Sequence, residues 1–307
     1  ITAAAWLWLT PFNSAPDEAA HFNYNVDVML QNHRLPISGQ DDLEAYRLVI
    51  PKRWGPVVSI YSYCVYPQFN YVVAAASAWV IEQALDWPIW RGARLASLGW
   101  GLVYLNALWF TLLLLTRRHV FASLAVTASA AFIPQIVYLS SYTNADIHSL
   151  ASSALLALAV VYFAQNASRC SILWLGLASG LLLTAKYNFL LLGPLVPAFI
   201  VGVGWQRRWS VGRVLITGCV VGLIAVGLSG YWYVRNAILY GDPLGMRFAL
   251  DLMAQYGEPK PAMPLTLDSM RLLMRLNFHG GTFESLIGRF GYMTIGLPAP
   301  SYLVAML

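Results

Sequence analysis

Long apolar segments recur along this chain and constrain its fold more than any other feature. A helix that crosses a bilayer needs about 20 residues at a rise of about 1.5 Å per residue. The segments that meet this length lie at about 92–116, 120–142, 147–166, 188–205 and 212–234. A shorter segment at 170–185 also spans if Lys186 snorkels at its end, and partial spans lie at 1–10 and 286–307. We therefore expect an all-α polytopic membrane protein with a single transmembrane domain over residues 1–307.

The composition supports a membrane protein and excludes other classes. Apolar residues make up 58% of the 307 residues and charged residues only 11%, whereas a soluble domain carries about 25% charged residues. The net charge is +5, but the basic residues are scattered singly or in pairs, which is typical of cytoplasmic loops and not of nucleic-acid binding. The cysteines have no CxxC spacing and indicate no metal site or disulfide. The chain begins and ends within apolar runs, so we expect further membrane helices beyond Leu307.

The charges of the loops indicate how the segment 66–86 lies. If this segment lies along the membrane surface, the basic loop residues fall on one side and the acidic ones on the other, as the positive-inside rule requires. The basic side then holds Arg117, Arg118, His119, Arg169, Arg207, Arg208 and Arg213, and the acidic side holds Asp17, Glu18, Asp41, Asp42, Glu44, Asp146 and the loop 242–268. We therefore expect two large non-cytoplasmic loops, 11–91 and 235–285. Their apolar periodicity predicts juxtamembrane helices at 16–34, 66–86, 243–256 and 264–278.

Polar residues gather at the ends of the spans on this acidic side. They are Asp17, Glu18, His21, Arg94, Asn144, Asp146, His148, Lys186, Arg235 and Asn236. Carboxylates and imidazoles in one place hold a hard divalent cation, or let one carboxylate take a proton from a hydroxyl. Lysine and arginine nearby bind a phosphate or diphosphate. Basic residues on the acidic side therefore indicate an anionic ligand.

Each of these residues also has a structural interpretation. Ser14 and Asp17 fit a helix-capping box, although capping does not explain Glu18 and His21 beside them. The three basic residues suit snorkelling at the interface. Asn144 suits a cap of the helix that follows it, and His148 suits a packed histidine.

Four segments of the chain together resemble a known family. The first is Ala15-Pro16-Asp17-Glu18-x-x-His21-Phe22, followed by Arg34-Leu35-Pro36. It resembles the first-loop signature of the polytopic membrane glycosyltransferases of the GT-C superfamily, and is closest to an uncharacterised bacterial membrane-protein family that usually reads Pro-Pro-Asp-Glu-x-x-His-Phe. The other segments are Tyr142-Thr143-Asn144-Ala145-Asp146, Tyr231-Trp232-Tyr233-Val234-Arg235-Asn236 with Tyr240-Gly241-Asp242-Pro243-Leu244, and Glu284-Ser285-Leu286-Ile287-Gly288-Arg289-Phe290-Gly291.

The resemblance implies a GT-C-like helix bundle in the bacterial inner membrane. Such an enzyme transfers a sugar from a polyprenyl-phosphate donor to an acceptor hydroxyl at the outer face, with inversion at the anomeric carbon. It implies that Asp17 is the general base, with Glu18 as the second catalytic carboxylate. The implied donor-binding residues are Arg94, Asn144, Lys186, Arg235 and Asn236, and the implied ligands of a divalent metal cation, Mg or Mn, are Asp146, His148 and His21.

This chain departs from the family at two places. Ala15 replaces the leading proline of the first motif. Tyr66-Pro67-Gln68-Phe69-Asn70-Tyr71 stands where many relatives have Pro-Pro-Leu-Tyr-Tyr.

Two other classes of function compete with the glycosyltransferase. One is a non-catalytic subunit or scaffold of a larger membrane complex, in which the juxtamembrane helices pack on partner membrane subunits. The other is a lipid or solute transporter. The spans lack the paired Gly/Pro-interrupted helices expected of inverted repeats, although Gly193-Pro194 and Pro197 interrupt one of them.

Overall fold

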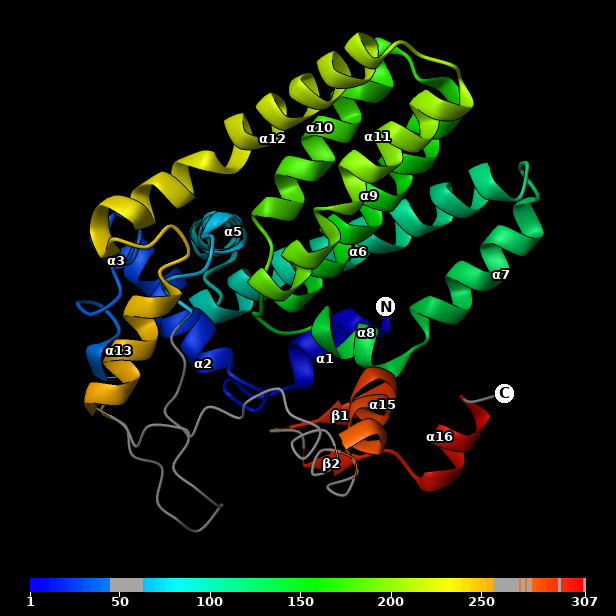
Figure 1. The fold of residues 1–307 in the computed structure, drawn as a ribbon. Coiled ribbons are helices and arrows are strands. Elements are labelled where there is room, and N and C mark those ends of the chain that lie inside the picture. The colour runs from blue at the N-terminus through cyan, green and yellow to red at the C-terminus, as the bar shows by residue number, and fades with distance from the viewer. Residues whose placement is uncertain (45–62, 257–270, 272–273, 275–277, 292–293, 306–307) are drawn as a thin grey trace.

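The protein is an all-α membrane protein, as the apolar segments predict. The computed structural model describes residues 1–44, 63–256, 271, 274, 278–291 and 294–305 (Figure 1). Within them the only strands are a two-residue antiparallel pair. The elements in chain order are α1 (Thr2–Leu9), α2 (Glu18–His21), the π-helix η1 (Phe22–Asp27), α3 (Val28–Asn32), α5 (Phe69–Leu85), α6 (Ile89–Leu115), α7 (Val120–Ala131), α8 (Pro134–Leu139), α9 (Asp146–Asn166), α10 (Arg169–Leu183), the 3-10 helix η3 (Tyr187–Leu192), α11 (Leu195–Gln206), α12 (Val211–Tyr240), α13 (Met246–Tyr256), α15 (Phe278–Gly288), β1 (Arg289–Phe290), β2 (Ile295–Gly296) and α16 (Ala299–Val304).

Four helical segments in the described residues are long and apolar enough to cross a membrane. They are α6, α9, α12 and the segment Tyr187–Gln206, which joins η3 to α11. Only 17% of an apolar 18-residue window is buried in α6 and in α12. Because these helices are apolar on the outside of the bundle as well as inside, their outer faces require a hydrocarbon surrounding.

Proline and glycine explain where the helices differ from the predicted spans. The predicted span 120–142 is two helices, α7 and α8, because Pro134 lacks a donor and disfavours helical geometry at Ile133. The predicted partial span 286–307 is the end of α15, the short strand pair and α16. Gly291, at φ 58°, lies between the two strands. In the other direction, α12 continues past the predicted end at 234 and stops at Gly241, which has a φ of 69°.

The basic turns of the chain meet at one end of the bundle. The side chain of Gln165 in α9 donates from Nε2 to the carbonyl oxygen of Leu114 at 3.0 Å. The guanidinium of Arg207 donates from Nη2 to the carbonyl oxygen of Gln165 at 2.6 Å. These bonds join the turns that follow α6, α9 and α11, and the α6–α7 and α11–α12 turns lie at the upper right of Figure 1. The loop charges had grouped the same turns on one side of the membrane.

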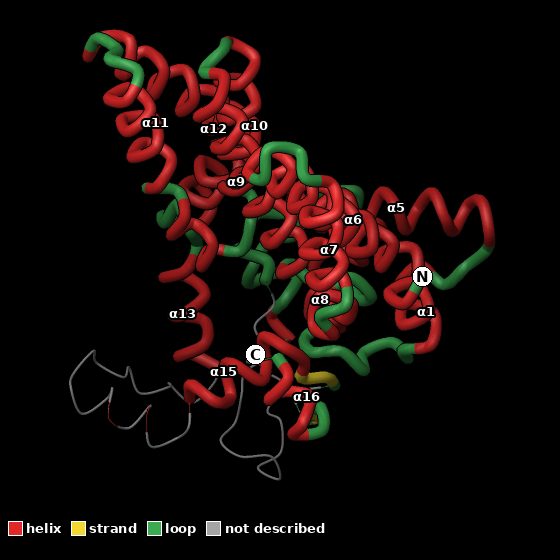
Figure 2. Tube along the Cα trace, turned by 90° about the vertical axis from the view of Figure 1, so that its right-hand side faces the viewer, coloured by secondary structure: helices red, strands yellow, loops and turns green. Residues whose placement is uncertain are grey.

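Helix α5 runs across the bundle. Figure 1 views α5 along its axis while α9, α10 and α12 are seen from the side, and Figure 2 shows α5 from the side. Its first turn bonds to the start of α9, since Asn70 Nδ2 donates to the carbonyl oxygen of Asn144 at 2.9 Å. Farther along, Ala78 packs on the first turn of α6 so closely that a Cβ on Gly92 would lie 2.6 Å from its Cα. Because α6 and α9 both begin at this end, the orientation of α5 supports a helix along the surface.

The predicted helix 16–34 forms as three consecutive pieces, α2, η1 and α3. Apolar side chains of these pieces, including Phe22 and Val26, form a buried cluster with α5 and α6. The predicted helix 243–256 is α13, whose Phe248 stacks on Tyr240 with ring centroids 4.7 Å apart. The predicted helix 264–278 lies almost wholly outside the described residues.

Candidate functional site

The four motif segments lie at the end of the bundle opposite the basic turns. The backbone N–H of Thr143 donates to Glu18 Oε1 at 3.4 Å, which joins the second segment to the first. The backbone N–H of Gly291 in the fourth segment donates at 3.1 Å to the hydroxyl of Tyr138, four residues before the second. The third segment, on α12, reaches the first through the loop that contains Val65. Segments that are far apart in the sequence therefore surround one region.

Asp17 presents an exposed carboxylate in this region. It precedes α2 with a left-handed backbone, φ 57° and ψ 9°, and its side chain makes no capping bond. The predicted capping box of Ser14 and Asp17 is therefore wrong. Instead, Asp17 Oδ2 accepts a hydrogen bond from the hydroxyl of Tyr63 at 2.8 Å. Non-glycine residues held at positive φ are concentrated at functional sites, although aspartate tolerates this conformation better than most.

Tyr63 connects the acidic residue to the rest of the site. Its ring stacks on His21 with centroids 4.0 Å apart, and Lys186 Nζ lies 5.5 Å from the centre of the same ring. Burial and the carboxylate of Asp17 raise the pKa of the Tyr63 hydroxyl, so the hydroxyl stays protonated and donates to Asp17. The sequence analysis missed Tyr63. The tyrosines at 61, 63 and 66 are the signal that could have found it.

Lys186 and Asp146 form an ion pair beside Tyr63. Lys186 Nζ lies 3.1 Å from Asp146 Oδ1 and 3.4 Å from Oδ2. Their side chains are 21% and 33% exposed, so both reach solvent. Asp146 opens α9, where the helix dipole favours a carboxylate. The backbone N–H of Lys186 donates to the hydroxyl of Ser149 at 3.0 Å, which fixes the lysine at the end of α10.

His21 is buried beneath these residues. Its Nδ1 lies 2.6 Å from the hydroxyl of Tyr71, within hydrogen-bonding distance. Burial lowers the pKa of the imidazole well below 6.5, and the positive charge of Lys186 lowers it further. His21 is therefore neutral at physiological pH and supports the Tyr63 ring, where the resemblance implied a metal ligand.

Glu18 and Arg94 form a fully buried ion pair. Both side chains have 0% exposure, and Arg94 binds the carboxylate through Nε at 2.6 Å and Nη2 at 2.7 Å. The remaining donors of Arg94 bind the carbonyl oxygens of Leu7, Thr10 and Pro11 at 2.8, 2.7 and 3.1 Å. Since all five N–H groups of Arg94 have a partner within the chain, the predicted donor-binding role of Arg94 and the catalytic role of Glu18 give way to a structural one. The pair joins α1, α2 and α6.

Asn144 and His148 also have structural roles. Asn144 Oδ1 accepts from the backbone N–H groups of Asp146 and Ile147 at 2.9 and 3.0 Å, so it caps α9. Its Nδ2 donates to two carbonyl oxygens, at 2.7 Å each. His148 is buried and packs edge-on against Trp100, with ring centroids 4.6 Å apart. Asn144 therefore caps a helix where donor binding was predicted, and His148 is a packed histidine where metal binding was predicted.

The proposed metal ligands do not form a site. Among the described residues, no three His, Cys, Asp or Glu side chains lie close enough together to hold a metal ion. Of the three predicted ligands, His21 bonds to Tyr71 and His148 packs on Trp100, which leaves Asp146. One remaining carboxylate does not fit Mg or Mn, which take several oxygen ligands.

The third motif holds the loop that carries Tyr63. The carbonyl oxygen of Val65 accepts from Tyr187 Oη at 2.7 Å, Asn236 Nδ2 at 3.0 Å and Trp232 Nε1 at 3.3 Å. Asn236, predicted to bind the donor, is fully buried and positions this loop instead. The Asn236–Val65 hydrogen bond could not be predicted from residue types, because its acceptor is a backbone carbonyl, which every residue has.

Arg235 lies in a groove on the outer side of α12. The groove has a volume of about 630 Å³ and is lined by Arg34, Leu35, Ile37, Tyr231, Val234, Arg235, Ile238 and Leu239. Arg235 Nη2 donates to the carbonyl oxygen of Pro36 at 2.7 Å, and its guanidinium lies 4.8 Å from the centre of the Trp232 ring. Its Nη1 is buried and has no hydrogen-bond partner among the described residues. An arginine that lines an apolar groove suits an anionic ligand.

The region thus combines three chemical elements. Asp17 offers an exposed base, the Lys186–Asp146 pair offers mixed charge beside it, and Arg235 offers a cation in an apolar groove. Such groups can take a proton from a hydroxyl and bind a phosphate. Comparisons of the chain with protein-family models, with curated proteins and with solved structures found no match.

Proposed function

We propose that this protein is a glycosyltransferase of the bacterial inner membrane. It moves a sugar from a polyprenyl-phosphate donor to an acceptor hydroxyl at the non-cytoplasmic face. The observation that carries the proposal is the exposed carboxylate of Asp17, which Tyr63 orients at 2.8 Å in the region where the four motif segments meet. A carboxylate held in one orientation and open to solvent is suited to general-base catalysis.

The groove on α12 supports a lipid-phosphate donor. Arg235 lines the groove, and arginine is a residue that binds phosphate groups well. Val234, Ile238 and Leu239 are exposed along the same side of α12, as an isoprenoid chain would require. The groove lies away from the basic turns, which supports a reaction at the membrane face opposite to them.

In the proposed reaction, Asp17 and Arg235 act on the two reacting groups. The oxygen of the acceptor hydroxyl attacks the anomeric carbon while Asp17 takes the hydroxyl proton. The bond between the anomeric carbon and the phosphate oxygen breaks, and its electron pair leaves with the lipid phosphate. Arg235 stabilises the negative charge that develops there. Attack from the side opposite the leaving group inverts the anomeric configuration.

A non-catalytic subunit or scaffold is the second candidate. It is favoured by the structural use of Glu18 and Arg94, which bond to each other, and of the Asn236 amide nitrogen, which bonds to the Val65 carbonyl. A scaffold needs the buried pair and the Val65 contact but has no use for an exposed, oriented carboxylate at Asp17. The two candidates therefore differ in what Asp17 does.

The Asp17→Asn variant tests the proposal. Asparagine keeps the size and tolerates the left-handed backbone, so the fold should be retained. We expect transfer from a polyprenyl-phosphate sugar in isolated membranes to fall about 10²- to 10⁴-fold, the usual contribution of a general base. Asp27→Asn is the matched control, because Asp27 lies in η1 and its carboxylate, among the described residues, accepts a hydrogen bond only from Gln31 Nε2, at 2.7 Å. Full transfer in Asp17→Asn would contradict the general-base role and favour the scaffold.

A further inference from the structure

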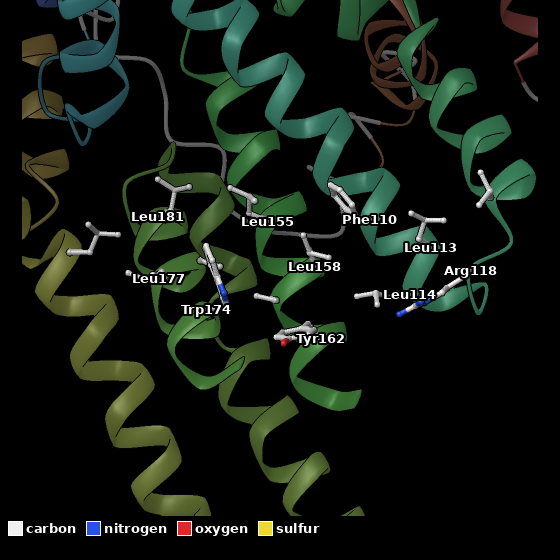
Figure 3. A pocket seen from close by; sticks show the side chains of 14 residues that line it. Phe110, Leu113, Leu114, Arg118, Leu155, Leu158, Tyr162, Trp174, Leu177 and Leu181 are labelled. Carbon is white, nitrogen blue, oxygen red and sulfur yellow. The ribbon is translucent and has the colours of Figure 1, made fainter. Parts of the chain in front are cut away.

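A second groove lies at the basic end of the molecule, away from Asp17. It has a volume of about 790 Å³, within the range of about 300–1,000 Å³ that is typical of small-molecule sites. Its floor is α9, where Leu155, Leu158 and Tyr162 follow one another at helical spacing and so share one face. Figure 3 shows these three side chains in the middle of the groove. We call it the α9 groove.

Helices α6 and α10 form the walls of the α9 groove. On α10, Trp174 and Leu181 lie seven residues apart on one face, and on α6 Phe110 and Leu114 face the groove from the other side (Figure 3). The separation of seven positions from Trp174 to Leu181 corresponds to about 10 Å along α10. The groove is therefore an elongated apolar channel, which matches an alkyl chain in shape and polarity.

One end of the α9 groove is polar. Arg118 lines it from the turn after α6, and Figure 3 shows its guanidinium extending back toward Leu114. The hydroxyl-bearing ring of Tyr162 lies at the same end in this view. Arg118 itself is exposed, and in the part of the chain that the structure describes no carboxylate forms an ion pair with it. A ligand that fits has an apolar chain and an anionic head.

We propose that the α9 groove binds an anionic phospholipid, with an acyl chain along α9 and the phosphate on Arg118. Basic residues at the cytoplasmic ends of membrane helices attract anionic headgroups, each by about 1 kcal/mol. An apolar helix of another protein would cover the channel but offer no group of opposite charge to Arg118. Charge complementarity therefore favours a lipid over a protein as the occupant. The proposal does not depend on the transferase activity.

Native mass spectrometry of the purified chain in neutral detergent tests the proposal. The probes are phosphatidylglycerol and phosphatidylcholine with the same acyl chains. We expect the wild-type protein to retain phosphatidylglycerol at least about fivefold better, the ratio that corresponds to about 1 kcal/mol. Equal retention of the two lipids would overturn the proposal.

Two variants test the binding of the lipid headgroup and of the acyl chain separately. Arg118→Gln should lower retention of phosphatidylglycerol about fivefold, to the level of phosphatidylcholine. Leu158→Trp should fill the channel and abolish retention of both lipids. The matched controls are Arg208→Gln, another exposed arginine in a basic turn with a positive φ, 53° against 70° for Arg118, and Leu223→Trp on the exposed face of α12.

The controls decide which outcomes count against the proposal. If Arg208→Gln lowers retention as much as Arg118→Gln, the lipid binds the basic end in general and the α9 groove is not its site. If a cysteine introduced at Leu158 crosslinks to a second protein chain in native membranes, a protein occupies the groove. Wild-type retention in both controls, with loss in the two groove variants, would support the lipid site.

Discussion

Asp17 and Glu18 are adjacent in the chain, but their carboxylates lie in different surroundings. Glu18 is completely buried and bonds to Arg94, which in turn holds the end of α1 and the start of α6. Asp17 is exposed and accepts one hydrogen bond, from Tyr63. The comparison teaches that two acidic residues at a helix start can divide two tasks between them. Glu18 belongs to the framework of the site, whereas the carboxylate of Asp17 remains open to solvent.

The buried pair should give the largest effect on stability. Arg94→Gln leaves the Glu18 carboxylate buried without its partner, and such changes cost about 3–5 kcal/mol. Chemical unfolding of the purified protein in detergent measures this cost. Arg91→Gln is the matched control, because Arg91 also lies near the start of α6, and its guanidinium lies 4.2 Å from the centre of the Trp8 ring, with no carboxylate paired to it among the described residues. Replacing both Glu18 and Arg94 by leucine should restore much of the loss, since it removes the unpaired charge. An equal effect of Arg91→Gln and Arg94→Gln would contradict the framework role.

The second largest effect on stability should be its dependence on pH, which the His21 imidazole causes. Burial and Lys186 lower the pKa of this imidazole in the folded state, whereas in the unfolded chain the group titrates near its ordinary value of 6.5. As the pH falls below 6.5, the unfolded chain gains a proton that the folded chain does not, so the free energy of unfolding decreases. The slope from this one group is about 1.4 kcal/mol per pH unit. Unfolding measured between pH 7 and 5 should be less steep by this amount in His21→Gln. The same slope in both proteins would mean that His21 protonates in the folded state.

Tyr63→Phe should separate the orientation of the Asp17 carboxylate from the stability of the fold. The change removes the hydroxyl that donates to Asp17 but keeps the ring that stacks on His21. We expect transfer to fall about tenfold, which corresponds to about 1.4 kcal/mol of transition-state stabilisation. The free energy of unfolding should change by less, because Asp17 is exposed and water replaces the hydroxyl. Tyr66→Phe in the same loop is the control. A large loss of stability with unchanged transfer would mean that the Tyr63–Asp17 hydrogen bond stabilises the fold and does not serve transfer.

Lys186→Gln should have the smallest effect on stability. Its ion pair with Asp146 is partly exposed, at 21% and 33%, and such pairs contribute about 0–1 kcal/mol. Set beside Arg94→Gln, this variant tests whether burial decides the contribution of an ion pair at this end of the molecule. The same unfolding measurement in detergent applies. A loss as large as that of Arg94→Gln would show that the Lys186–Asp146 pair belongs to the framework.

Much of the helical fold could be predicted from the sequence. The apolar segments near 92–116, 147–166 and 212–234 correspond to α6, α9 and α12, because composition and length suffice to define such helices. The break at Pro134 was also visible in the sequence, but the apolar residues on either side of it concealed the interruption. The strand pair after residue 288 depends on local glycine geometry that hydropathy does not report.

The site was harder to predict because burial decides the role of each residue. A carboxylate and an arginine 76 positions apart give no sequence signal of a pair, so Glu18 and Arg94 were both expected to act on a substrate. The capping role of Asn144 could be predicted, because the hydrogen bond that its side chain accepts from Ile147 depends only on neighbouring residues. Tyr63 lies in a loop with no periodicity, and only the fold brings it to Asp17.

The Val65 carbonyl has a mechanical consequence. It fastens the loop of Tyr63 to the last turns of α12, a helix of 30 residues that is about 45 Å long and begins among the basic turns. A rigid rod fixed near one end to this loop acts as a lever. A tilt of α12 that begins at its far end would displace Tyr63 together with the helix and change the angle at which its hydroxyl meets Asp17. The position of the Tyr63 hydroxyl is therefore tied to the orientation of the whole of α12.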